Sequence, residues 1–187
     1  MADKDDKESL ILEIVRNALV HGLDSNGFVV GEDATPAYGG TEATEDFCCA
    51  DNLANTLSFN VYVEYLDELD KPGDPLIPFL MVTSETPIAQ TDFVDNSQGF
   101  AMTITILAFL GQFDGIVTPN AIAYTGEKAA RVFRKRLVDM LNVIEFPDVV
   151  IYEQKDVQGM DTRGPAEGDN WSFLTGASIT IQYLPEI

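Results

Sequence analysis

The side chains of this chain that are best suited to chemistry are carboxylates, which occur in short runs. The runs Asp67-Glu68-Leu69-Asp70 and Glu32-Asp33 carry the oxygen ligands that Ca²⁺ and Mg²⁺ prefer. The spacing Asp-x-Asp-x-Asp-Gly of a calcium loop does not occur, and Asp161, Glu167 and Asp169 do not supply it either. The sequence therefore favours a solvated acidic surface over a dedicated cation site, and we predict no metal.

The motifs of nucleophilic and nucleotide chemistry are missing from the sequence. It has no Gly-rich phosphate loop and no Gly-x-Ser-x-Gly, and one histidine, His21, leaves little room for a catalytic triad. The only cysteines, Cys48 and Cys49, are adjacent, and because a bond between neighbours is strained we expect two reduced thiols. We therefore predict that the chain is not an enzyme and binds no cofactor. A small acidic ligand-binding or hydrolytic α+β domain that uses a carboxylate pair is the alternative.

The basic residues are concentrated in one short segment. Residues 24–114 hold sixteen acids and a single base, Lys71, within a net charge of −20. This segregation predicts one basic face on an otherwise anionic surface, a pattern that lets copies of a molecule bind head to tail. Five of the eleven Lys and Arg residues lie within nine positions: Lys128, Arg131, Arg134, Lys135 and Arg136.

The bulk composition fits a single domain that spans residues 1–187. The chain is 45% hydrophobic and 22% charged, which is ordinary for a globular protein. A pI near 4.1 argues against binding to the phosphate backbone of DNA, because that affinity comes largely from Lys and Arg. No stretch approaches the roughly 20 apolar residues that cross a bilayer, and residues 1–7 lack the order of a signal peptide. We expect no membrane partner, and a protein made and used in a cytoplasm or in a particle assembled there.

Two segments have helical periodicity, over residues 7–21 and 126–145. In the second helix the apolar residues fall in one arc and all five bases fall outside it. Val132 and Val138 lie among these bases, which suits the rim of a subunit interface. The alternative is a solvated helix surface with snorkelling side chains. The apolar arc contains Ala129, Ala130, Phe133, Leu137, Met140, Leu141 and Ile144.

The remaining regular pattern predicts strands. The strands at 79–83 and 102–110 are expected to pair as a long hairpin. The element order predicts an α+β fold, with an antiparallel or mixed sheet of about four to five strands and two main helices packed on one face. The five predicted strands are 57–65, 79–83, 102–110, 149–154 and 173–184.

Two irregular segments interrupt these elements. Residues 22–52 form a long acidic insertion with five glycines and seven acids, which is either mobile or ordered by something outside the subunit. Residues 159–170 are expected to form a protruding hairpin loop. Trp171, at the base of that loop, is either a core residue or an interface anchor. The predicted contacts with a partner are Gly159, Asp161, Arg163 and Trp171.

The layout of these elements resembles that of the tail terminator, or tail-completion, proteins of tailed bacteriophages. The resemblance is carried by the order of the elements: the helix from Leu10 to Leu19, the strand at 57–65, the pair at 79–83 and 102–110, the helix at 126–145 and the closing strand at 173–184. The insertion at 22–52 departs from the compact pattern of that family.

The resemblance implies a structural virion protein of the tail and neck, assembled in the host bacterial cytoplasm. Such a subunit closes into a hexameric ring that caps the tail tube and joins it to the head connector. Its partners are then itself, the tail tube protein and the head–tail connector proteins, and DNA passes through without specific binding. Another head–tail connector or tail-tube subunit is the alternative. A ring needs heterologous contacts, which a basic helix facing an acidic surface supplies.

Overall fold

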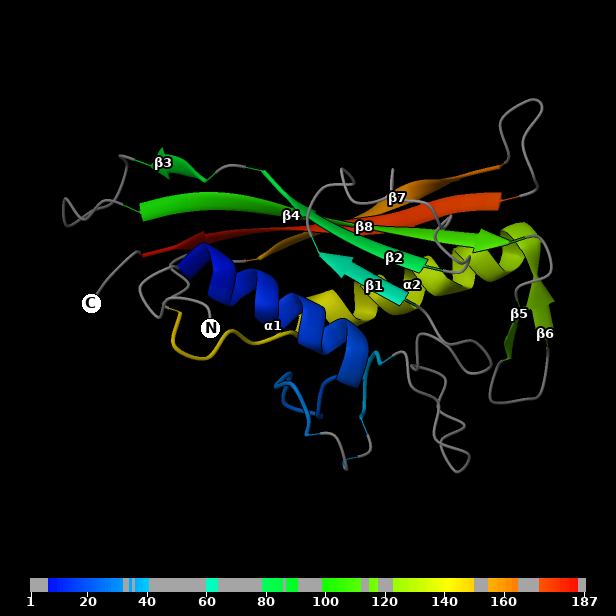
Figure 1. The fold of residues 1–187 in the computed structure, drawn as a ribbon, viewed down its shortest axis with the longest axis horizontal. Helices are drawn as coiled ribbons and strands as arrows, with labels where there is room; N and C mark the ends of the chain where they lie inside the picture. Colours follow the sequence, from blue (N-terminus) through cyan, green and yellow to red (C-terminus); the bar gives the residue numbers. More distant parts are fainter. Residues whose placement is uncertain are drawn as a thin grey trace, which may run out of the picture.

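The computed structural model has two helices on one face of a mixed β-sheet (Figure 1). It describes residues 7–31, 34, 36–40, 60–63, 79–85, 87–90, 99–111, 115–117, 123–149, 155–164 and 172–184. The helices are α1 (Lys7–His21) and α2 (Gly126–Val143), close to the two predicted from periodicity. The predicted α+β class, with both helices packed on one face of the sheet, is confirmed.

The sheet is built around two long antiparallel strands. Across it the order is β1, β2, β4, β8, β7, with β3 also paired to β4. The β1–β2 pair is parallel and the other pairs are antiparallel, so the sheet is mixed. The predicted hairpin of 79–83 with 102–110 is confirmed as β2 against β4. The bounds are β1 (Asn60–Val63), β2 (Phe79–Ser84), β3 (Ile88–Gln90), β4 (Gly99–Gly111), β7 (Asp156–Arg163) and β8 (Ser172–Tyr183).

Alternation along the central strands explains why one face of the sheet is covered by helices. In β4 and β8, paired residues such as Ile104 and Ile179 are fully buried on the helix side. The alternate pair Thr103 and Thr180 lies on the other face, where their hydroxyl oxygens are 3.0 Å apart. A strand with this period buries one apolar face and leaves the other face polar.

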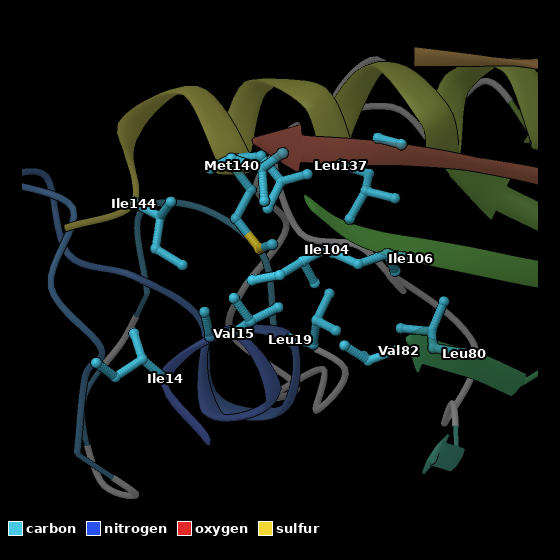
Figure 2. Close-up of a cluster of buried hydrophobic side chains, with 14 of the residues drawn as sticks. Ile14, Val15, Leu19, Leu80, Val82, Ile104, Ile106, Leu137, Met140 and Ile144 are labelled. Carbon is cyan, nitrogen blue, oxygen red and sulfur yellow. The ribbon is translucent and has the colours of Figure 1, made fainter. Parts of the chain in front are cut away.

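The core lies between this face and the two helices. Figure 2 shows Val15 and Leu19 from α1 and Met140 from α2 converging on the sheet around Ile104. Because α1, the sheet and α2 share a single apolar cluster, the helices and the sheet are held as one unit.

The last edge strand lies later in the chain than the sequence predicts. Val149 is not in a strand, residues 150–154 lie outside the described residues, and β7 begins at Asp156. Gly159–Arg163, predicted to open a protruding loop, instead form the second half of β7, and 165–171 lie outside the described residues. The prediction of a loop is wrong for residues 159–163, because β7 carries few apolar side chains and only its pairing with β8 defines it as a strand.

Three short strands were not predicted. One is β3, and the other two pair with each other in a separate small sheet, as β5 (Gly115–Val117) and β6 (Ala123–Thr125). Strands of three residues are too short to leave a periodic pattern in the sequence. The strand expected over 57–65 is observed as β1, and its flanks at 57–59 and 64–65 lie outside the described residues.

The described part of the acidic insertion packs on the chain's own helices. Leu23 is fully buried, and its backbone bonds to that of Tyr38. At the end of α2, the amide of Glu145 donates to the carbonyl of Gly27 at 2.8 Å. Residues 22–31 and 36–40 are therefore ordered by contacts within the chain, whereas the prediction considered only mobility or an outside partner.

A carboxylate shapes the turn inside that segment. Asp24 accepts hydrogen bonds from the backbone amides of Asn26 at 2.8 Å and Phe28 at 3.0 Å. These bonds, led by the one from Phe28, hold the pKa of Asp24 below its ordinary value because they favour the charged carboxylate. The turn therefore owes part of its shape to a side chain that stays ionised.

Candidate functional site

The exposed bases of α2 form a stripe on the side of the helix that faces away from the sheet. We call Lys128, Arg131 and Lys135 the basic stripe. Arg131 pairs with Glu127 and Lys135 with Asp139, each at 2.5 Å and each one helical turn apart. The Arg131 and Lys135 side chains are 63% and 77% exposed, so these pairs contribute only about 0.3–0.5 kcal/mol each. Such weak pairs can exchange for contacts with another surface.

Arg134 does not belong to the stripe, because its side chain bonds within the chain. Its Nη1 donates to the carbonyl oxygen of Met160 in β7 at 2.9 Å and lies 3.8 Å from Asp161 Oδ1. A Cβ built on Gly159 would lie 3.4 Å from both Arg134 Cδ and Val138 Cγ2, so α2 approaches β7 closely at this glycine. The fold thus brings Arg134, predicted for a contact between subunits, beside Gly159 and Asp161, predicted for a contact with a partner.

The prediction that all five bases share one outer face is wrong for Arg136, which is only 4% exposed. At 100° per residue, Arg136 falls about 20° outside one edge of the apolar arc, and Arg134 falls about 20° outside the other edge. The three stripe residues lie opposite the arc. The spacing therefore already indicated that Arg134 and Arg136 differ from the other three bases. A residue that borders the apolar arc of a helix lies close to the layer that packs on that arc.

The two valines predicted for an interface rim pack partly against the chain's own core. Val132 and Val138 are half-buried and contact the hydrophobic core. Part of each side chain stays exposed, so their place at an interface rim stays a prediction.

Two of the predicted partner contacts, Asp161 and Arg163, lie at the end of β7. The register with β8 shifts between Met160 and Arg163, which marks a β-bulge. Asp161 and Arg163 are exposed there, and Arg163 lies opposite Leu174 in the register of β7 with β8. Trp171 lies outside the described residues, so its role stays a prediction.

Lys155 is a partly buried cation that sequence reasoning did not find. Its side chain is 16% exposed and donates to the carbonyl of Ile144, just past the end of α2, and to Glu145 at 3.2 Å. Its Nζ also lies 5.6 Å from the centre of the Phe146 ring. The last turn of α2 carries no base of its own, so Lys155 supplies the positive charge that the helix end favours.

Replacing Lys155 by methionine is expected to destabilise the fold by about 1–2 kcal/mol, since the stem still packs while the charge and its hydrogen bonds are lost. The measurement is the midpoint of urea unfolding. The matched control is Lys128→Met, which removes an equal charge from the exposed start of α2 and is expected to change stability by less than about 0.5 kcal/mol. Equal midpoints for the two variants would contradict the assigned role of Lys155.

Two features were sought in the described part of the chain, a metal-binding cluster and a helix that could span a membrane. Within it, no group of three or more His, Cys, Asp and Glu side chains is arranged to hold a metal ion. Among the helices described, none has the length and apolar character needed to span a bilayer.

No protein-family model matches the chain, and no curated protein sequence matches it. The resemblance to tail terminator proteins therefore stays a prediction that rests on the order of elements.

Proposed function

We propose that this chain is a structural subunit of a tailed-phage neck, of the tail terminator type, that closes into a ring and caps the tail tube. The observation that supports self-assembly is the basic stripe on the exposed side of α2. The basic stripe lies on α2, which packs on β7 and β8 at one edge. The sequence adds that residues 24–114 hold sixteen acids and a single base, so a surface of opposite charge is available elsewhere in the chain.

This segregation of bases from acids along the sequence suits a head-to-tail contact, in which one surface meets a different surface on the next copy. Contacts of that kind close into rings when the rotation between copies divides a full turn. Complementary charge speeds encounter and fixes the relative orientation of two surfaces. The terminator role, the sixfold ring and the partnership with tail tube and head connector come from the resemblance in layout. DNA would pass through such a ring without specific binding, as the acidic composition favours.

The first test is the mass of the purified protein by light scattering at low and high salt, with negative-stain images of the same samples. Rings at low salt that dissociate at high salt are expected, because exposed charge pairs are screened by salt. Single rings that cap purified tail tubes would identify a terminator, whereas long stacked tubes would indicate a tube protein. A monomer at every salt concentration, indifferent to tail proteins, would overturn the proposal.

The second test reverses the charge of the stripe with the double substitution Arg131→Glu and Lys135→Glu. Ring formation is expected to be lost while the fold is kept, because both side chains are exposed and make only weak pairs. Arg134 is left intact, since its side chain bonds to β7. The control is the single reversal Arg16→Glu at an exposed position on α1, compared with the single reversal Arg131→Glu, which changes the net charge equally. Rings that persist in the stripe variant would exclude the stripe as the interface.

A further inference from the structure

The tip of the turn at residues 24–28 carries a chemically labile pair of residues. Asn26 is exposed and is followed by Gly27, and no other asparagine in the sequence precedes a glycine. Asparagine is thermolabile because the backbone nitrogen of the next residue can attack its side-chain amide. Glycine at that next position lacks the Cβ that would hinder the attack. The turn is therefore the place in this sequence where such a reaction is chemically easiest.

The reaction needs water and no other reagent. The Gly27 nitrogen forms a bond to Asn26 Cγ, the bond from Cγ to Nδ2 breaks, and ammonia leaves with the proton of the Gly27 amide. Water then opens the resulting cyclic imide at either of its carbonyl carbons. One opening gives aspartate, and the other gives isoaspartate, in which the main chain runs through the former side chain.

The folded turn engages the attacking nitrogen in a hydrogen bond. Gly27 N donates to the carbonyl oxygen of Asp24 at 3.1 Å, and Asp24 N donates to that of Phe28 at 2.8 Å. These bonds close a short hairpin loop in which Gly27 takes the left-handed position, with φ +88°. The Asp24 carboxylate accepts from the amides of Asn26 and Phe28, at 2.8 Å and 3.0 Å. Since the Gly27 nitrogen must leave its acceptor before it attacks, the turn has to open first.

The same glycine docks the turn on the end of α2. The Gly27 carbonyl accepts from the Glu145 amide at 2.8 Å, and a Cβ on Gly27 would overlap the Val143 carbonyl oxygen. Isoaspartate inserts an extra carbon atom into the main chain directly before Gly27. Because the reach of the backbone is fixed by its bond lengths, the added atom displaces Gly27 from this close fit.

We propose that Asn26 is a site of spontaneous deamidation, that the hydrogen bonds of Asp24 restrain the reaction, and that isoaspartate formed there releases residues 22–31 from α2. The main chain changes covalently, so the release is not reversed by refolding. The proposal rests on the turn alone, and the ring proposal can fail without affecting it.

The test follows deamidation of the purified full chain by mass spectrometry at mildly alkaline pH, where the attacking amide loses its proton more readily. A protease that cleaves after glutamate releases residues 14–32, a peptide that holds Asn17 as well as Asn26. Deamidation is expected at Asn26 and not at Asn17, because Asn17 lies within α1 and precedes an alanine. The chain unfolded in urea should react faster at Asn26 than the folded chain. Equal rates in the two states would overturn the restraint by the turn.

Two substitutions of Asp24 separate its hydrogen bonds from its charge. Asp24→Ala removes the acceptor of two backbone amides, so Asn26 is expected to deamidate at least about fivefold faster. Asp24→Asn keeps an acceptor oxygen and loses the charge, and its rate is expected to stay within about twofold of the wild type. An alanine variant that reacts no faster than the wild type would refute the role of Asp24. If Asn26 stays intact in that variant while the unfolded chain is converted, the site itself is excluded.

Hydrogen exchange of the converted protein tests the release from α2. Deamidation adds a negative charge, so ion exchange separates the converted chain from the unconverted one. The Glu145 amide is expected to exchange faster in the isoaspartate form, with the core amides of β4 unchanged. The matched control is Asn26→Asp, which has the same charge without the extra main-chain carbon and should keep Glu145 protected. Protection of Glu145 in the isoaspartate form equal to that of the control would refute the release.

Discussion

Replacing Gly176 by alanine is expected to lower the melting temperature by roughly 10 °C or more. Gly176 sits in the middle of the sheet, where β8 pairs with Leu107 of β4 on one side and Met160 of β7 on the other. A Cβ at this position would overlap the carbonyl oxygen of Ile106 and lie 3.2 Å from its carbon.

The clash is costly because neither side can move away. Ile106 is fully buried and belongs to the apolar cluster shared by both helices, so shifting its backbone would disturb the packing of the whole core. Glycine in the middle of a strand usually weakens it, and the close approach of another backbone is a recognised reason for its presence.

The measurement is thermal unfolding followed by circular dichroism. The control is Gly164→Ala, just after β7, where the nearest atom to a Cβ is Phe173 Cε1 at 4.0 Å. That variant is expected to melt within about 2 °C of the wild type, since surface substitutions rarely change stability by more than about 0.5 kcal/mol. A Gly176 variant as stable as this control would show that the close approach of β4 and β8 is not fixed.

Replacing Gly27 by alanine is expected to release residues 22–31 from the end of α2 and to cost about 2–4 kcal/mol. The Gly27 backbone has φ +88°, a left-handed conformation that side chains with a Cβ rarely adopt. A Cβ there would also overlap the carbonyl oxygen of Val143 at the end of α2. Both penalties act on the segment that anchors the start of the acidic insertion.

The readout is hydrogen exchange at the Glu145 amide, which donates to the Gly27 carbonyl at 2.8 Å. Faster exchange there, with the core amides of β4 unchanged, would show local release of the segment. Gly31→Ala is the matched control, because nothing lies within 4 Å of a Cβ at Gly31. Unaltered exchange at Glu145 in the Gly27 variant would contradict the docked arrangement.

The sequence by itself determined the elements whose apolar side chains repeat. In α1 the period of Ile11, Val15 and Leu19 predicts both the helix and its buried face, and the structure places all three at zero exposure. In β4 and β8 the alternation predicts strands with one buried face, and the fold class follows from their order. These predictions succeeded because the spacing of apolar residues within one segment indicates both the type of element and the face that it buries.

Residues without such a pattern are placed by contacts with segments far away along the chain. The strand β7 exists because β8 offers it a partner, although its own side chains are mostly polar. The five bases of α2 separate into an exposed stripe, a buried Arg136 and an Arg134 bonded to β7, which depends on what packs on each edge of the helix. A sequence gives the angle at which a side chain leaves a helix, whereas the neighbour it meets at that angle comes from segments far away along the chain.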